Sequence, residues 1–223
     1  MSRTVRLAFS LLALAWSAHL WGAPAALPVI LVLGDSLSAG YGLPLDAGWV
    51  SLLQMRLKEH GYQYQIVNAS VSGETTLGGR NRIEALLETH SPKIVVIELG
   101  ANDGLRGLSP DAVHDNLETI IDASRRQGAQ VLLVGMRLPP NYGTAYIKKF
   151  ENVYRDLARQ KKVRLAPFLL EGFADQRELF QPDGVHPTRE AQPRMLENVW
   201  TELESMLMKL GKRRGEVQPS FAG

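Results

Sequence analysis

Residues 29–41 read VILVLGDSLSAGY, an apolar run that stops abruptly at Gly34-Asp35-Ser36. A nearly continuous run of aliphatic residues is typical of a strand that is covered on both faces of a parallel sheet. A serine placed directly after such a strand has two interpretations. It is either a nucleophile held at the end of the strand or a polar residue that caps the following helix. Three other parts of the chain decide between them.

Further short apolar runs follow the first one, and amphipathic stretches separate them. The five candidate strands are residues 28–33, 64–68, 94–99, 130–135 and 163–166. Between them, apolar residues recur at helical spacing, and Ser109-Pro110 has the form of a helix start. Such an alternation implies right-handed βαβ units with helices on both faces of a parallel sheet. The sequence therefore predicts one domain, a three-layer α/β/α sandwich with a five-stranded parallel sheet.

The first 25 residues have the form of a secretory signal peptide. Arg3 and Arg6 precede a short apolar core at residues 7–16, and Ala23-Pro24-Ala25 offers small residues for cleavage. The apolar core is too short for a comfortable membrane span, and an uncleaved N-terminal anchor is the alternative. We expect cleavage near Ala25, export to the periplasm or the medium, a folded domain over residues 26–210 and a flexible tail over residues 211–223.

Composition excludes several classes of partner. Removal of the two arginines in residues 1–25 lowers the formal net charge from +2 to 0, which argues against nucleic acid as a partner. The absence of cysteine excludes disulfides and thiolate metal sites. The sequence also lacks a closely spaced histidine pair of the His-x-x-x-His kind. We therefore expect no metal and no cofactor.

Polar clusters follow the candidate strands. They are Gly34-Asp35-Ser36, the NASVSG segment at 68–73, GAND at 100–103 and DGVHP at 183–187. Each cluster alone is explained more simply as a turn, a cap or a surface loop. However, ligands of open α/β sheets bind outside the carboxyl ends of the strands, so all four clusters are expected at one edge of the sheet.

Together these clusters supply the parts of an acyl-transfer site. Ser36 is a hydroxyl nucleophile, and His186 is the kind of base that works near neutral pH. Asp183 lies three residues before His186, where its carboxylate can accept from the imidazole across a tight turn. Gly73 can bring its backbone N–H close to a substrate, and Asn102 can add an amide donor for an oxyanion.

The same blocks resemble the SGNH, or GDSL, hydrolase superfamily. The similar segments are GDSLSAGYGL from residue 34, GWV at 48–50, NASVSGETT at 68–76, ELGANDGLRG at 98–107, RLPPNYG at 137–143 and PDGVHPTREAQP at 182–193. They resemble the bacterial esterase, thioesterase I and arylesterase branch, which includes an enzyme also called lysophospholipase. The resemblance runs from about residue 28 to 207. The Gly-x-Ser-x-Gly elbow of α/β-hydrolases is absent, because residue 38 is serine.

The resemblance implies a flavodoxin-like SGNH hydrolase domain and a role for each block. Ser36, Asp183 and His186 would form the catalytic triad. The oxyanion hole would consist of the Ser36 N–H, the Gly73 N–H and the Asn102 side chain. The substrate of the protein would be a small acyl ester or thioester, including aryl esters and lysophospholipids. We expect a monomer that contacts lipid or micelle surfaces transiently.

Two other functions remain open at this point. Some SGNH branches are carbohydrate O-deacetylases, and a secreted small-anion binding module would use loop N–H groups without turnover. The nearby loops favour an apolar acyl chain over a sugar, because they carry Leu105, Leu108, Pro139 and Tyr142. Packing of these side chains against the core is the alternative interpretation. The loop at 104–110 is our candidate for the wall of the acyl site.

Asp35 and Asp103 each adjoin a residue of the expected site. Either carboxyl is a competitor for the role of the triad acid. We instead predict that both hold their loops in place by accepting hydrogen bonds from backbone N–H groups.

Overall fold

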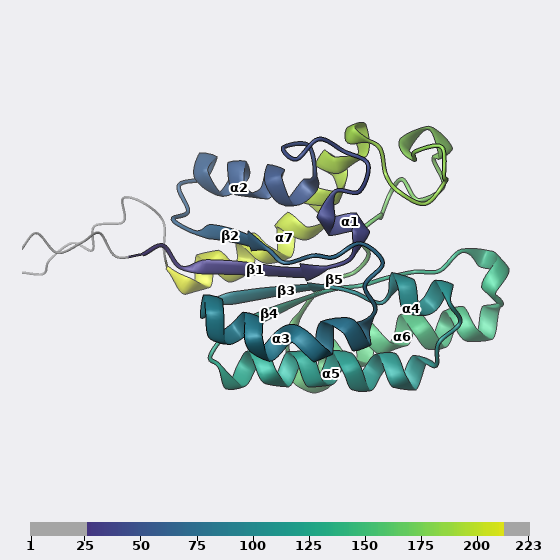
Figure 1. The fold of residues 1–223 in the computed structure, drawn as a ribbon, viewed down its shortest axis with the longest axis horizontal. Helices are drawn as coiled ribbons and strands as arrows, with labels where there is room; N and C mark the ends of the chain where they lie inside the picture. Colours follow the sequence, from purple (N-terminus) through teal and green to yellow (C-terminus); the bar gives the residue numbers. More distant parts are fainter. Residues whose placement is uncertain (1–25, 212–223) are drawn as a thin grey trace, which may run out of the picture.

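A computed structural model of the protein describes residues 26–211 (Figure 1). The signal-peptide interpretation of residues 1–25 and the tail interpretation of residues 212–223 both fall outside this range. Within the described part of the chain, no helix has the length and apolar character needed to cross a membrane.

The core of the fold is a five-stranded parallel sheet with the strand order β2-β1-β3-β4-β5. The strands are β1 (Val29–Gly34), β2 (Gln65–Asn68), β3 (Ile94–Glu98), β4 (Gln130–Val134) and β5 (Arg164–Ala166). The predicted strands all exist, with bounds that differ by at most one residue. All residues of β3 are buried, and so are the last five of β1, as the continuous apolar runs predict.

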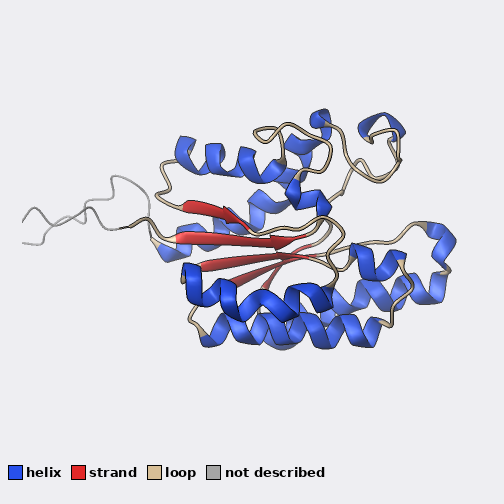
Figure 2. Cartoon of the chain, in the orientation of Figure 1, coloured by secondary structure: helices blue, strands red, loops and turns tan. Residues whose placement is uncertain are grey.

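Helices cover both faces of the sheet, which gives the predicted three layers (Figure 2). One face carries α2 (Trp49–Glu59) and α7 (Gln192–Leu210), which pack against each other. The other face carries α3 (Thr76–His90), α5 (Pro110–Arg126) and α6 (Thr144–Lys161). The buried stripes of these helices are those of the sequence, for example Phe150, Val153, Tyr154 and Leu157 on α6.

Local signals at the start of α5 work as expected. Ser109 is the N-cap, its hydroxyl accepts from the Asp111 N–H, and Pro110 is the first helical residue. Two short helices were not expected. They are α1 (Ser36–Ala39), directly after β1, and α4 (Ala101–Leu105), directly after β3. The sequence favoured turns at both places, because helices this short leave too little room for periodicity to appear.

The strand order indicates where on the sheet a ligand is expected to bind, at the carboxyl ends of β1 and β3. The chain runs outward from β1 to β2 on one side and from β3 to β5 on the other, so connections leave β1 and β3 toward opposite faces. The carboxyl ends of β1 and β3 are direct neighbours, with Gly34 paired to Glu98. Both short helices begin there, and they carry Ser36 and Asn102.

Candidate active site

Ser36 is the first residue of α1 and is partly buried at the end of β1. Asp35 caps this helix, because its Oδ1 accepts from the Leu37 N–H at 3.0 Å. At the other end, Gly40 adopts a left-handed conformation with φ of 72°, which turns the chain sharply after a single helical turn. The serine is therefore fixed by the cap of Asp35 rather than being the cap itself.

Asp183 and His186 lie in the long loop between β5 and α7. The Asp183 Oδ1 accepts from the backbone N–H groups of Val185 at 2.9 Å and His186 at 3.0 Å. The other carboxylate oxygen, Oδ2, lies 2.8 Å from the His186 Nδ1. On the far side of the ring, the His186 Nε2 lies 2.9 Å from the Ser36 Oγ. These three residues, 150 positions apart at their extremes, form one hydrogen-bonded chain.

The partners fix the tautomer of His186. An ionised carboxylate can only accept, so Nδ1 carries the hydrogen and Nε2 is free to accept from the Ser36 hydroxyl. The hydrogen bond from the His186 backbone, followed by the one from its side chain, lowers the pKa of Asp183 to about 2. Asp183 is thus charged throughout the neutral range, and its hydrogen bond turns the Nε2 of the imidazole toward the Ser36 hydroxyl.

Gly73 and Asn102 belong to segments that are hydrogen-bonded to Gly34 and Asp35, the two residues before Ser36. Gly73 lies in the loop after β2 with φ of 80°, a conformation that glycine adopts without strain. The backbone of this loop is held against β1, because the Val71 N–H donates to the Gly34 carbonyl at 3.0 Å. The Asn102 amide donates to the Glu74 carbonyl at 3.0 Å and to the Asp35 Oδ2 at 3.1 Å.

These contacts hold the amide beside the start of α1, and both of its hydrogens have acceptors within the protein. An oxyanion would have to share one of them. Catalytic hydrogen bonds often reach their working geometry only with substrate bound, so this arrangement is compatible with the expected role. No acceptor for the Gly73 N–H occurs among residues 26–211.

Asp35 and Asp103 act as the sequence predicted. Both are buried, and Asp103 accepts from the backbone N–H of Thr76 at 2.9 Å and from its hydroxyl at 2.6 Å. Asp103 thereby joins α4 to the start of α3, while Asp35 joins α1 to α4 through Asn102. Burial raises the pKa of Asp35 to about 6, although its hydrogen bonds and the nearby His186 act in the opposite direction.

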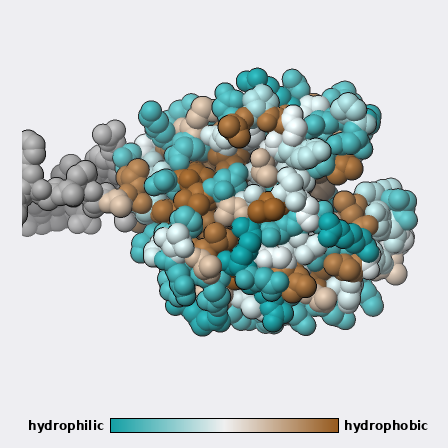
Figure 3. Space-filling model, in the orientation of Figure 1, coloured by the Kyte–Doolittle hydropathy of each residue, from teal (hydrophilic) through white to brown (hydrophobic). Residues whose placement is uncertain are grey.

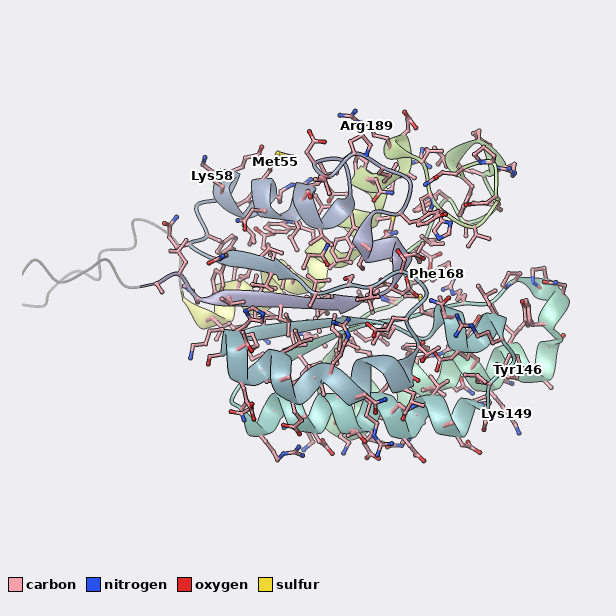
Figure 4. The ribbon with its side chains drawn as sticks, viewed as in Figure 1. Met55, Lys58, Tyr146, Lys149, Phe168 and Arg189 are labelled. Atoms are coloured by element: carbon pink, nitrogen blue, oxygen red, sulfur yellow. The ribbon has the colours of Figure 1, made fainter. Side chains whose placement is uncertain are left out.

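A pocket of about 450 Å³ lies beside this chain of groups. One wall comes from α4 and the segment after β4, and the other from the loop between β5 and α7. Figure 3 shows the hollow at the right-hand end of the molecule, with hydrophobic residues on both of its edges. Phe168, labelled in Figure 4, belongs to its lining. The other apolar lining residues include Leu105, Leu138, Pro139, Leu170, Phe180 and Val185.

The four residues expected to bind substrate divide into two pairs. Leu105 and Pro139 line the pocket. Leu108 and Tyr142 lie outside its lining, and they support the wall instead. The Tyr142 hydroxyl donates to the Leu105 carbonyl at 3.0 Å, and the Tyr146 hydroxyl donates to the Leu108 carbonyl at 2.7 Å. The loop at 104–110 is thus tied by Tyr142, which precedes α6, and by Tyr146, which lies in the first turn of α6.

Two residues of the site were missed by sequence reasoning. The Tyr41 ring lies against the His186 imidazole, tilted by 35°, with ring centroids 4.4 Å apart. Arg177 donates to three successive carbonyls, those of Phe180, Gln181 and Pro182, at 2.8 to 2.9 Å. Tyr41 belongs to the GDSLSAGYGL block, which is the signal that marks it, whereas nothing in the sequence around Arg177 distinguishes it from a solvated arginine.

One group of side chains in the described chain has the composition of a metal site. His114, Asp115 and Glu118 bring ligand atoms within 4.8 Å of one another on α5. The Glu118 carboxylate also pairs with the Lys161 ammonium at 2.7 Å. All three residues lie on α5, on a different part of the fold from Ser36, and they play no part in the hydrogen-bonded chain of Asp183, His186 and Ser36.

Comparison with known proteins identifies the relatives of this chain. The sequence profile of the GDSL-like lipase/acylhydrolase family matches residues 32–192. Esterase TesA of Pseudomonas aeruginosa is 51% identical over 82% of this chain and 91% of its own length. Thioesterase 1/protease 1/lysophospholipase L1 of Escherichia coli K12 is 42% identical over 76% and 80%, respectively. A crystal structure of TesA superposes with a TM-score of 0.78, at 51% identity, over 80% of this chain and 99% of that one.

Arg177 offers a test of how the loop of Asp183 and His186 is held. Removal of its guanidinium in Arg177→Ala frees three carbonyls and loosens the loop, so we expect the rate at which a fluorophosphonate labels Ser36 to fall roughly tenfold. Arg177→Lys should recover part of the rate, since an ammonium can still donate. Arg189→Ala, at another exposed arginine nearby in the chain, is the control (Figure 4). Equal labelling rates in all four proteins would contradict this role.

Proposed function

The chain belongs to the GDSL-like lipase/acylhydrolase family, and we propose that it is a serine hydrolase that cleaves carboxylic esters and thioesters through an acyl-enzyme on Ser36. The observation that carries this proposal is the chain of hydrogen bonds from Asp183 through His186 to the Ser36 hydroxyl, at 2.8 Å and 2.9 Å. A helix cap needs no histidine aligned on its hydroxyl, and a small-anion binding module needs no carboxylate behind that histidine.

The proposed reaction follows from these contacts. His186 Nε2 takes the proton of the Ser36 hydroxyl as the oxygen attacks the carbonyl carbon, and Asp183 stabilises the imidazolium that forms. The oxyanion is held by the Ser36 and Gly73 N–H groups and by the Asn102 amide. His186 then gives its proton to the leaving alcohol or thiol. A water molecule repeats the sequence on the acyl-enzyme and releases the acid.

The leaving group is not strongly selected in this proposal. The catalytic groups act on the carbonyl, and the leaving group requires only a proton from His186. Phenolates and thiolates leave readily, so aryl esters and thioesters are included with alkyl esters. The relative from Escherichia coli carries the names thioesterase and lysophospholipase, which supports the same range of substrates for this chain.

The apolar pocket favours an acyl chain over the acetyl group of a glycan. Its lining is mostly aliphatic and aromatic, and a volume of about 450 Å³ exceeds the needs of an acetyl group. Carbohydrate deacetylation is therefore the weaker alternative.

Exposed apolar side chains near the site support a transient contact with lipid or micelle surfaces. They include Tyr41, Val71 and Val185, which are 52%, 50% and 48% exposed and lie on loops that carry site residues. Such side chains can enter the surface of a lipid aggregate that presents substrate. We expect weak, reversible co-sedimentation with phosphatidylcholine vesicles that decreases in Val185→Ser. Unchanged sedimentation of that variant would remove the loop from the contact.

Export of the protein is part of the same proposal. Cleavage near Ala25 would release a monomeric domain beginning at residue 26, in the periplasm or the medium. The intact mass of the exported protein measures the cleavage position, and light scattering of the same sample measures its oligomeric state. Retention of residues 1–25 in a membrane fraction would favour the uncleaved anchor.

Substitution of the nucleophile tests the proposed reaction. Ser36→Ala is expected to lower kcat on a chromogenic ester by on the order of 10⁴-fold, because among residues 26–211 no other hydroxyl is hydrogen-bonded to the His186 Nε2. The thermal midpoint should change little, since the cap of α1 belongs to Asp35. Activity that survives the substitution would disprove the acyl-enzyme on Ser36.

The pocket lining allows a matched test of acyl selectivity. Leu105→Ala removes an apolar side chain from the wall, so kcat/KM for an octanoyl ester should fall relative to an acetyl ester by roughly fourfold or more. Leu108→Ala changes a leucine in the same loop that does not line the pocket, and its chain-length profile should stay within twofold of the unmodified enzyme. The reverse pattern would place the acyl chain elsewhere.

A further inference from the structure

Glu98 is a buried carboxyl that the proposed reaction does not use. It is the last residue of β3, is 0% exposed, and pairs with Gly34 across the sheet. Its side chain therefore lies beneath the turn from β1 into α1. Since carboxyl groups are rarely buried without a partner, its place under the nucleophile calls for an explanation.

The carboxyl of Glu98 holds this turn from below. Its Oε2 accepts from the Ser38 hydroxyl at 2.5 Å and from the Asp35 N–H at 3.3 Å. Gly34 makes room for these contacts, because a Cβ at this position would lie 2.7 Å from both the Glu98 Oε2 and the Ser38 Cβ. The glycine and the serine on either side of Asp35-Ser36 thus fit the buried acid as a set.

The surroundings of Glu98 favour the neutral form of its carboxyl. Burial is the main reason that its pKa lies well above the usual value, and the adjacent Asp35 carboxyl raises it further. The Glu98 Oε1 is buried and has no hydrogen-bond partner within residues 26–211. A carboxylate with one oxygen unsatisfied in this way would be costly, whereas the neutral acid is tolerated.

Asp35 is the neighbour that gains from this neutrality. Its Oδ1 caps α1 at Leu37, and its Oδ2 accepts from the Asn102 amide. Both bonds are strongest when Asp35 is ionised. Two adjacent buried carboxyls do not ionise together cheaply, so a neutral Glu98 leaves the single negative charge on Asp35. The other titratable groups around the pair are His186, Asp103 and Tyr154.

We infer that Glu98 is a positioning residue for the oxyanion hole: a neutral buried acid that seats residues 35–38 and keeps Asp35 as the anion that orients the Asn102 amide. This inference rests on the proposed function, in which Asn102 serves the oxyanion. Glu98 is expected to affect the chemical step rather than substrate binding, because the Asn102 amide is needed once charge develops on the carbonyl oxygen.

Two variants at Glu98 test the inference, with kcat and KM measured on a chromogenic ester and thermal unfolding measured in parallel. Glu98→Gln keeps a neutral acceptor of the same shape, and its kcat should stay within threefold of the unmodified enzyme. Glu98→Ala leaves the turn unsupported, and its kcat should fall roughly 30-fold or more while KM changes less than threefold. Between pH 5 and 8, the pH profile of kcat/KM for Glu98→Gln should coincide with that of the unmodified enzyme.

Tyr154→Phe is the structural control. Its hydroxyl is buried nearby and donates to the Leu99 carbonyl at 2.8 Å, without contact to Asp35 or Asn102. This variant should lose thermal stability with kcat unchanged within threefold. A loss of kcat in Tyr154→Phe as large as that in Glu98→Ala would reduce the effect at Glu98 to stability and overturn the inference.

Two further results would also overturn it. One is a Glu98→Ala enzyme with normal kcat. The other is a Glu98→Gln enzyme whose kcat drops tenfold, or whose pH profile of kcat/KM shifts by a full pH unit on its acid side. Either result would mean that Glu98 acts as an anion. If Glu98→Ala does not fold, the Glu98→Gln profile decides alone. Failure of the proposed function is read separately, from activity that persists in Ser36→Ala.

Discussion

The parallel pairing of β1 with β3 is the constraint on which the site depends. It sets Gly34 beside Glu98, so the two short helices that follow these strands begin next to each other. This arrangement brings Ser36 on α1 close to Asn102 on α4. Asp35 joins the two helices, because its carboxylate accepts from the Asn102 amide. The strand order reverses direction at the same pair, which opens the edge of the sheet to a ligand.

The long loop before α7 completes the site from outside the sheet. It has little regular structure, yet the Asp183 carboxylate accepts from the loop backbone, and the Arg177 guanidinium binds the three carbonyls that precede Asp183. Its far end is fixed where α7 begins, because the Gln192 side chain accepts from the Trp49 N–H of α2. A histidine on a loop can act with a serine on the sheet edge only because the loop is held at both ends.

The site keeps its carboxyl groups in different states. Asp183 is surrounded by N–H donors and partly exposed, so the pKa of its carboxyl falls. Asp35 and Glu98 are buried side by side, so the pKa of each rises. The same chemical group therefore serves as the partner of an imidazole in one place and as an internal support in another. The difference comes from solvent exposure, hydrogen-bond donors and neighbouring charges.

The sequence predicted the strands and their parallel arrangement, because burial on both faces leaves continuous apolar runs, and it predicted a site where polar clusters follow these strands. It also determined the roles of Asp35 and Asp103 as supports of their loops. Packing between distant segments settles which loop residues line the pocket, and it separates Leu105 from Leu108, although both are leucines on one short loop. Likewise, Glu98 reads as part of an apolar strand, and Arg177 as a solvated charge. Their roles arise from contacts between segments that are distant in the chain, and no local pattern encodes such contacts.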